Sequence, residues 1–165
     1  MSLRVRAALA SVAAAGALVL SGCGSADVAA RVDGQVITES DVAAVVKDLN
    51  AAYPGQQQPV TSAAALHALI QAPTLIAYAE AHGFPQTASA ARAQIPIPDP
   101  SDATVQALRW VAVSKQLSQQ DNIALAATFS QLKVDVNPKY GTYDPATAGL
   151  TWVSPNWLHV IPAQQ

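Results

Sequence analysis

The 165-residue sequence has one cysteine, two glutamates and few charged residues of any kind. Charged side chains make up 12% of it, which is too few for an acidic disordered tail or a coiled coil. Lysine and arginine occur singly and the net charge is −2, so the basic face that nucleic-acid binding requires is missing. With 51% hydrophobic residues, the chain can form one domain with its own core.

Signatures of catalysis and of metal binding are also missing. The sequence contains no G-x-S-x-G motif, no P-loop, no dinucleotide-binding glycine motif and no pair of carboxylates arranged for acid–base work. His67 and His82 lie fifteen residues apart, which is not a spacing of metal ligands. Ser154, His159 and Asp144 would form a hydrolase triad only through a geometry that sequence does not reveal. We therefore expect no enzyme, no cofactor and no metal site.

The first 22 residues have the pattern of a signal peptide. Arg4 and Arg6 precede an apolar run over residues 7–20, about fourteen residues long, which is short for a membrane span. The next residues, LSGC, resemble a bacterial lipobox, in which Cys23 is acylated and becomes the first residue of the mature protein. The alternative is an ordinary secretory peptide with an incidental cysteine, but this would leave an unpaired thiol in an exported protein.

Lipidation of Cys23 predicts where the protein lies. Removal of residues 1–22, with their two arginines, leaves 143 residues that carry 7 basic and 11 acidic side chains, a net charge of −4. Two acyl chains give stable anchoring, so we expect a lipoprotein on the extracytoplasmic face of a cell membrane. Residues 23–28 would be a lipidated tether, residues 29–145 the folded domain and residues 146–165 an apolar C-terminal tail.

The domain is predicted to begin with a β-hairpin. Asp33-Gly34 separates two short apolar runs, and this dipeptide favours a type I′ turn because both central residues need positive φ. A loose loop is the alternative. Thr38 or Ser40 can cap the helix that follows, and Thr38 with Asp41 resembles a capping box.

Helical spacing of apolar residues continues over most of the remaining chain. The pattern predicts helices over 42–52, 62–82, 87–94 and 101–117, and a fourth long helix that begins at Asp121 or Asn122. Pro73 lies inside the second helix, where it predicts a kink or two abutting helices. Residues 95–100 are expected to be extended. The pattern then predicts a strand around Val134 and Val136.

That late strand needs a partner, and the N-terminal hairpin is the one that the sequence offers. The first and last elements of the domain are therefore expected to share a small sheet. The predicted fold class is mainly α: a helical domain with a small β-hairpin near its N-terminus that is paired to a C-terminal strand.

Three segments carry a resemblance to a known family. AARVDGQVITESDV and ALHALIQAPTLIAYAEAHGF are similar to the hairpin and helices that open the N-terminal domain of SurA-type periplasmic chaperones and PrsA-like lipoproteins. VDVNPKYGTYD is similar to the segment with which that domain ends. The resemblance covers about residues 28–145, and it departs from the family pattern at Pro73 and at Lys139, where arginine is more usual. In the family a parvulin prolyl isomerase domain often follows; the residues after Asp144 are too few for one, so we expect it to be absent.

The resemblance implies a holdase that binds extended apolar segments of unfolded exported proteins, without ATP and without catalysis. The implied contact residues are Leu66, Leu69, Ile70, Leu108, Trp110, Trp152 and Trp157, although core packing predicts several of the same positions. The tryptophans of the tail either pack over the helical body or line or occupy an apolar groove. A structural lipoprotein that docks onto one fixed envelope partner is the alternative function.

Overall fold

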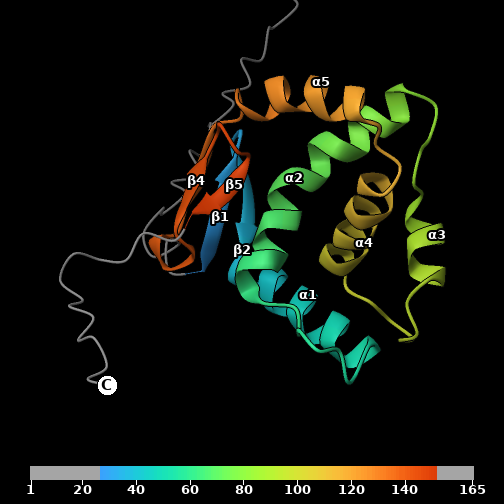
Figure 1. Cartoon of the computed structure of the whole chain (residues 1–165). Coiled ribbons are helices and arrows are strands. Elements are labelled where there is room, and N and C mark those ends of the chain that lie inside the picture. Colours follow the sequence, from blue (N-terminus) through green and yellow to red (C-terminus); the bar gives the residue numbers. More distant parts are fainter. Residues whose placement is uncertain (1–26, 152–165) are drawn as a thin grey trace, which may run out of the picture.

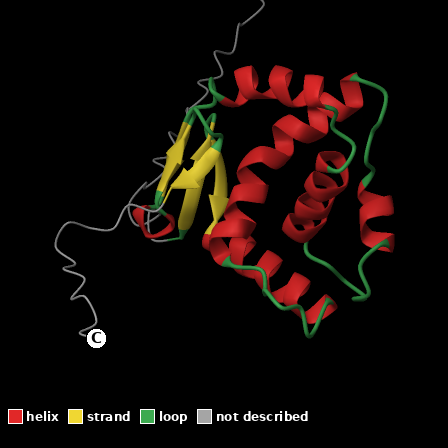
Figure 2. Ribbon diagram, in the orientation of Figure 1, coloured by secondary structure: helices red, strands yellow, loops and turns green. Residues whose placement is uncertain are grey.

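The computed structural model describes residues 27–151. The predicted signal peptide, Cys23, and the tail residues Trp152 and Trp157 lie outside the described residues. Within them the fold is mixed α/β, with 54% helix and small antiparallel sheets (Figures 1 and 2). The helical character is as predicted, but the share of β-structure is larger than the sequence indicated.

The N-terminal hairpin and the late strand form one sheet, as predicted. β1 (Val28–Val32) and β2 (Gln35–Thr38) pair antiparallel around Asp33 and Gly34, whose φ angles of 49° and 86° are both positive, as a type I′ turn requires. β3 (Val134–Val136) pairs antiparallel with the other edge of β1, which gives the strand order β2-β1-β3. The N-terminal hairpin and the late strand are therefore joined through β1.

α1 (Glu39–Ala52) begins at a capping box. The Asp41 backbone N–H donates to Thr38 Oγ1 at 3.1 Å, and the Thr38 backbone N–H donates to Asp41 Oδ2 at 2.9 Å. Of the two candidate caps, Thr38 is thus the one used. The helix ends at Ala52, as predicted, and Tyr53 is its C-terminal cap, followed by Pro54 and Gly55.

α2 (Ser62–Ala81) is a single helix that passes through Pro73, so two abutting helices are not formed. Pro73 is exposed, and its ring therefore faces solvent where a distorted turn is tolerated. The axis of α2 changes direction along its length (Figure 1). The helix stops before Gly83, which has a φ of 83°.

Of the remaining helices, α4 (Asp102–Ser114) and α5 (Gln119–Phe129) pack on α2, and α3 (Ala88–Ala93) packs on α4. α3 is short, and α4 is capped by Ser101, the residue at which the predicted helix starts. α5 begins earlier than predicted, because Ser118 is the cap and Asp121 is its capping-box partner rather than the first helical residue. Residues 95–100 form a series of bends instead of an extended run.

A second hairpin was not predicted. After a 3₁₀ turn, η1 (Pro138–Tyr140), the strands β4 (Thr142–Asp144) and β5 (Gly149–Thr151) pair antiparallel. This hairpin spans residue 145, where the sequence analysis separated the domain from its tail. Regular structure therefore continues to Thr151.

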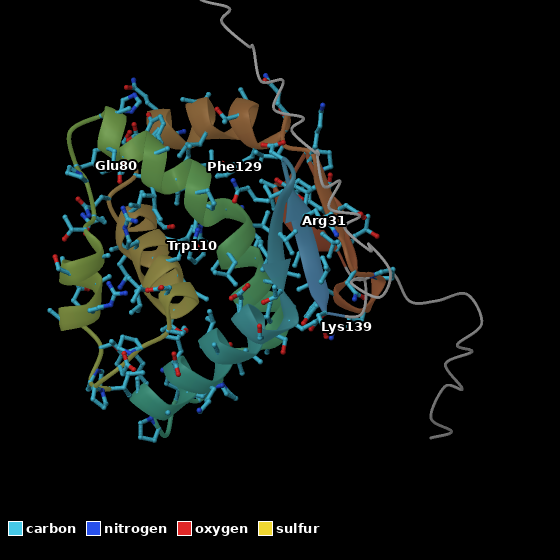
Figure 3. The ribbon with its side chains drawn as sticks, turned by 180° about the vertical axis from the view of Figure 1, so that it is seen from behind. Arg31, Glu80, Trp110, Phe129 and Lys139 are labelled. Atoms are coloured by element: carbon cyan, nitrogen blue, oxygen red, sulfur yellow. The ribbon has the colours of Figure 1, made fainter. Side chains whose placement is uncertain are left out.

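The core consists of two clusters that meet at Trp110. One lies between the three-stranded sheet, α1 and the first half of α2, and the other joins the second half of α2 to α4 and α5. Trp110 lies on α4, on the side of the molecule away from Arg31 and Lys139 (Figure 3). Its indole Nε1 donates to Gln71 Oε1 at 3.0 Å, so the one polar atom of this ring is paired.

Candidate functional site

The predicted contact residues do not form one surface in the described structure. Leu66, Leu69 and Ile70 are 0%, 3% and 0% exposed and belong to the core under the sheet. Trp110 is half-buried between the two core clusters, and Leu108 is half-buried on another face of α4. A polypeptide could reach the three α2 residues only if the helices separated.

Leu108 lines a groove of about 690 Å³ between α1, α4 and the segments that flank α3. We call it the α1/α4 groove. α3 and α4 lie on the side of α2 away from the sheets, whereas α1 starts at the end of β2 and runs below α4 (Figure 1). Its apolar and aromatic lining residues are Leu49, Tyr53, Val60, Leu108, Val111 and Ala112. Its polar lining residues are Gln56, Gln86, Gln94, Gln116 and Lys115. Its volume lies within the ordinary range of ligand sites.

α4 supplies the floor of the groove because it has two apolar faces. One face, with Val105, Ala107 and Val113, is buried in the protein. Leu108, Val111, Ala112 and Lys115 are spaced by three and four residues and form a second stripe, which lines the groove.

The wall opposite α4 is fixed by an amide clamp. The Asn50 side chain donates from Nδ2 to the Val60 backbone oxygen at 3.1 Å, and its Oδ1 accepts from the Val60 backbone N–H at 2.8 Å. This pair closes the loop between α1 and α2 and holds Val60 at the groove. Tyr53, 39% exposed, reaches across the groove to donate to the Gln94 backbone oxygen at 3.4 Å.

Two further contacts hold α4 in place. Asp48 Oδ2 accepts from the Ser101 backbone N–H at 3.0 Å and from Thr104 Oγ1 at 2.8 Å, which joins α1 to the start of α4. Burial disfavours the charged Asp48, but these hydrogen bonds outweigh it and lower the carboxyl pKa below its usual value. Arg109 of α4 donates to the Gln86 backbone oxygen and to Glu80 Oε1, so the segment before α3 is tied to the same helix.

The groove offers binding rather than acid–base chemistry. Lys115 is the single charged side chain among its lining residues, and no carboxylate, histidine or serine lines it. Each glutamine amide can donate and accept hydrogen bonds. An apolar floor with an uncharged amide rim can bury apolar side chains and pair with polar groups of any sequence.

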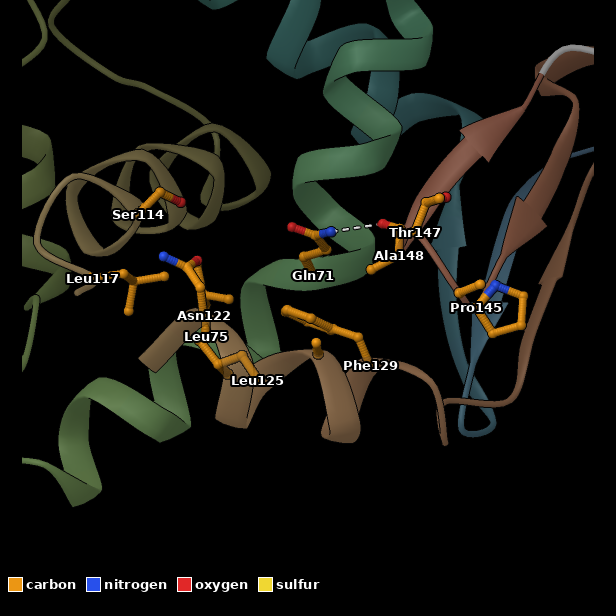
Figure 4. A pocket seen from close by; sticks show the side chains of 12 residues that line it. Gln71, Leu75, Ser114, Leu117, Asn122, Leu125, Phe129, Pro145, Thr147 and Ala148 are labelled. Atoms are coloured by element: carbon orange, nitrogen blue, oxygen red, sulfur yellow. Dashed lines mark hydrogen bonds between the residues drawn. The ribbon is translucent and has the colours of Figure 1, made fainter. Parts of the chain in front are cut away.

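A second, smaller hollow of about 270 Å³ lies between α2, α4, α5 and the turn of the β4–β5 hairpin (Figure 4). Gln71 Nε2 donates to the Ala148 backbone oxygen at 2.7 Å, and His67 Nε2 lies 3.1 Å from the same oxygen. Gln71 also accepts from Trp110. This polar chain attaches the hairpin to α2, and its role is to hold the fold together.

The histidines of the described residues have structural partners as well. His82 Nδ1 lies 2.8 Å from the Tyr78 backbone oxygen, and its ring stacks on that of Tyr78. No group of three histidine, cysteine or acidic side chains within residues 27–151 is arranged to hold a metal ion. Ser154 and His159 of the weighed triad lie outside the described residues.

Leu108 is the one lining residue of the groove that was predicted as a contact residue from the sequence; the others were missed. The second stripe of α4, residues 108, 111, 112 and 115, was a signal that could have located it. The glutamines gave no such signal, because amides in loops are common on any protein surface.

α2 is also long and apolar enough, by length and composition, to cross a membrane, and within residues 27–151 it alone meets this criterion. Half of that stretch is buried inside the protein, as in the core helix of a soluble domain. Searches with protein-family models, curated proteins and solved structures match nothing to this chain.

Proposed function

We propose that this protein is a membrane-anchored, extracytoplasmic lipoprotein that acts as a holdase without catalysis. It would bind extended, uncharged, apolar segments of unfolded exported proteins, its clients, in the α1/α4 groove. We further propose a SurA-type N-terminal fold for it. A hairpin, a central helix and a late strand that returns to β1 are the elements that this resemblance requires, and they support it.

The observation that carries the proposal is an apolar groove with a nearly uncharged rim. Leu108 and Val111 are half-buried, so each keeps apolar surface that a client side chain could cover. Burial of one leucine- or valine-sized side chain contributes about 1.5–3 kcal/mol. Two such anchors, less the cost of ordering the client, give weak and reversible binding, which suits a protein that must release its clients.

The rim supports binding without sequence specificity. An extended backbone presents N–H and C=O groups in alternation, and the four glutamines of the rim can pair with either kind. With Lys115 as the single charge of the lining, charged clients gain little there. The groove would therefore select for extended apolar character rather than for a motif.

The anchor would keep this groove close to a membrane. Cys23 lies outside the described residues, and β1 begins at Val28, five residues later. Five extended residues span at most about 18 Å. A domain on so short a tether would meet polypeptides as they emerge from that membrane.

The decisive experiment is suppression of client aggregation by the mature chain with Cys23→Ser, so that it is lipid-free. Light scattering from two unrelated, chemically denatured clients should fall as the protein is added. Val111→Asp, which places a charge on the groove floor, should abolish this suppression. The matched control is Ile123→Asp, because Ile123 is 66% exposed on α5 and does not line the groove.

The outcomes separate the candidate functions. Suppression that Val111→Asp removes and Ile123→Asp preserves supports the holdase. No suppression at severalfold excess, with one envelope protein recovered stoichiometrically, would instead support the scaffolding lipoprotein. Circular dichroism of both variants establishes that each is folded.

A further inference from the structure

The last described residues, at the end of β5, lie beside another hollow, distinct from the groove and from the 270 Å³ hollow. Leu150 of β5, the residue before Thr151, lines a hollow of about 430 Å³ with Ser62, Ala63, Lys139 and Tyr140. Ser62 and Ala63 are the first residues of α2. The residues that follow Thr151 therefore start next to the N-terminus of this helix.

This hollow and the α1/α4 groove are neighbours. Val60 lines the groove and Ser62 lines the hollow, and two residues span at most about 7 Å. The Asn50 clamp holds Val60 at this position. Thr61 is the one residue between the two linings along the chain.

The segment that starts there has the chemistry that the groove fits. Residues 152–165, WVSPNWLHVIPAQQ, contain no acidic residue, lysine or arginine, and they include Trp157, Leu158 and Ile161. Pro155 and Pro162 disfavour a helix. Fourteen extended residues reach about 46 Å, whereas a compact domain of this size is roughly 35 Å across. Length therefore does not prevent the segment from reaching the groove.

We propose that residues 152–165 bind in the α1/α4 groove of their own chain and compete there with clients. The competition rests on the proposed function, but the docking itself does not. A covalently linked occupant acts at an effective concentration of about 1 mM, so it excludes weak ligands and yields to an extended client that binds more tightly. The C-terminal segment thereby sets the lowest affinity at which a client can occupy the groove.

Disulfide trapping in the full mature chain tests the docking. In a Cys23→Ser background, Leu158→Cys is combined either with Gln116→Cys, on the groove rim, or with Ile123→Cys, on the exposed face of α5. We expect the first pair to form an intramolecular disulfide at least about tenfold faster, because the segment spends its time in the groove. Equal rates for the two pairs would overturn the proposal.

A binding measurement tests the competition. The triple variant Trp157→Ser, Leu158→Ser, Ile161→Ser should bind a fluorescent, uncharged apolar peptide about tenfold more tightly than the parent chain. This is the ratio for a competitor at about 1 mM effective concentration with an intrinsic dissociation constant near 0.1 mM. Val111→Asp added to the triple variant should remove the gain.

The two measurements also separate the two proposals. If the disulfide to residue 116 forms preferentially but no peptide binds, the result would support docking of the C-terminal segment and overturn the holdase function. Peptide binding that depends on Val111, with no preferential trapping and no effect of the triple variant, would support the holdase and overturn the competing segment.

Discussion

Val60 is held through both of its backbone polar groups by the side-chain amide of Asn50, ten residues earlier in the chain. The loop between them carries Tyr53 and Gln56 to the groove. The Asn50 side chain thus positions three residues that line the groove: Tyr53, Gln56 and Val60.

Asn50→Ala should loosen this wall and weaken client binding. It leaves the partly buried Val60 N–H and C=O unpaired, at a cost of about 1–2 kcal/mol in the free energy of unfolding. Urea denaturation measures this cost, and a peptide titration measures the affinity. Gln57→Ala is the control, because Gln57 is exposed in the same loop and does not line the groove. Equal affinities for Asn50→Ala and the parent would show that the clamp does not shape the site.

Gln71→Met should destabilise the fold by about 2 kcal/mol or more. The side chain keeps its approximate volume but loses its bonds to Trp110 Nε1 and to the Ala148 oxygen. The indole N–H is then unpaired in a part-buried site, whereas the Ala148 oxygen keeps His67 Nε2 at 3.1 Å. Chemical denaturation gives the loss, and near-ultraviolet circular dichroism should report a change around Trp110. The same substitution at the exposed Gln116 should change stability by less than about 0.5 kcal/mol. An equally small effect of Gln71→Met would show that the hydrogen bonds of Gln71 do not stabilise the fold.

Asp121 should make the stability of the protein depend on acid pH. Hydrogen bonds from Ser118, and then from Tyr78 Oη at 2.6 Å, lower the pKa of its carboxyl group from 3.8 to about 2. Because the pKa of Asp121 is lower in the folded state than in the unfolded chain, the charged carboxylate stabilises the fold. This contribution is fully present above the pKa of the unfolded state and disappears as the pH falls toward 2. The measurement is an NMR titration of the Asp121 carboxyl, with unfolding curves between pH 5 and 2. Asp121→Asn should reduce the loss of stability between pH 5 and 2. A titration midpoint near 3.8 for the Asp121 carboxyl would contradict the lowered pKa.

Tyr140→Phe should cost about 1–2 kcal/mol of stability at pH 7. Glu39 Oε2 accepts from Tyr140 Oη and from Lys139 Nζ, each at 2.6 Å, which ties the start of α1 to η1. Burial opposes the charged Glu39, but these two donors lower its pKa below the usual value. The stabilisation by charged Glu39 is therefore fully present above the ordinary pKa of a glutamate. It is lost as the pH falls through the lower pKa that Glu39 has in the folded protein.

The pH dependence is the check on this assignment. The difference in unfolding free energy between Tyr140→Phe and the parent should shrink as the pH falls through the lowered pKa of Glu39, because protonation of Glu39 weakens the bond. A difference that stays constant while an NMR titration shows Glu39 becoming protonated would mean that the hydroxyl acts through packing alone.

Several elements could be predicted because their determinants lie close together in the sequence. Asp33-Gly34 adopts the positive φ values that a type I′ turn needs, and Thr38 and Ser101 cap the helices that follow them. The late strand could be assigned to the N-terminal hairpin, since the hairpin was its one available partner, and the structure places it on β1. Even the start of α5 was missed by only a few residues, because Asp121 acts in the cap.

The candidate site could not be predicted in the same way. Leu66, Leu108 and Val111 are all apolar residues at helical spacing, and spacing alone does not tell which of them lies under the sheet and which lines a groove. The β4–β5 hairpin also depends on distant partners, since Ala148 is held by Gln71, 77 residues earlier.

The sequence by itself determined the turns, the caps, most of the helices and the pairing of the first and last strands of the three-stranded sheet. The tertiary structure alone decided that α2 continues through Pro73, that a second hairpin forms, and that one face of α4 remains accessible. The physical reason is range: a cap or a turn is stabilised by atoms within four residues, whereas exposure of a helix face depends on every element that packs around it.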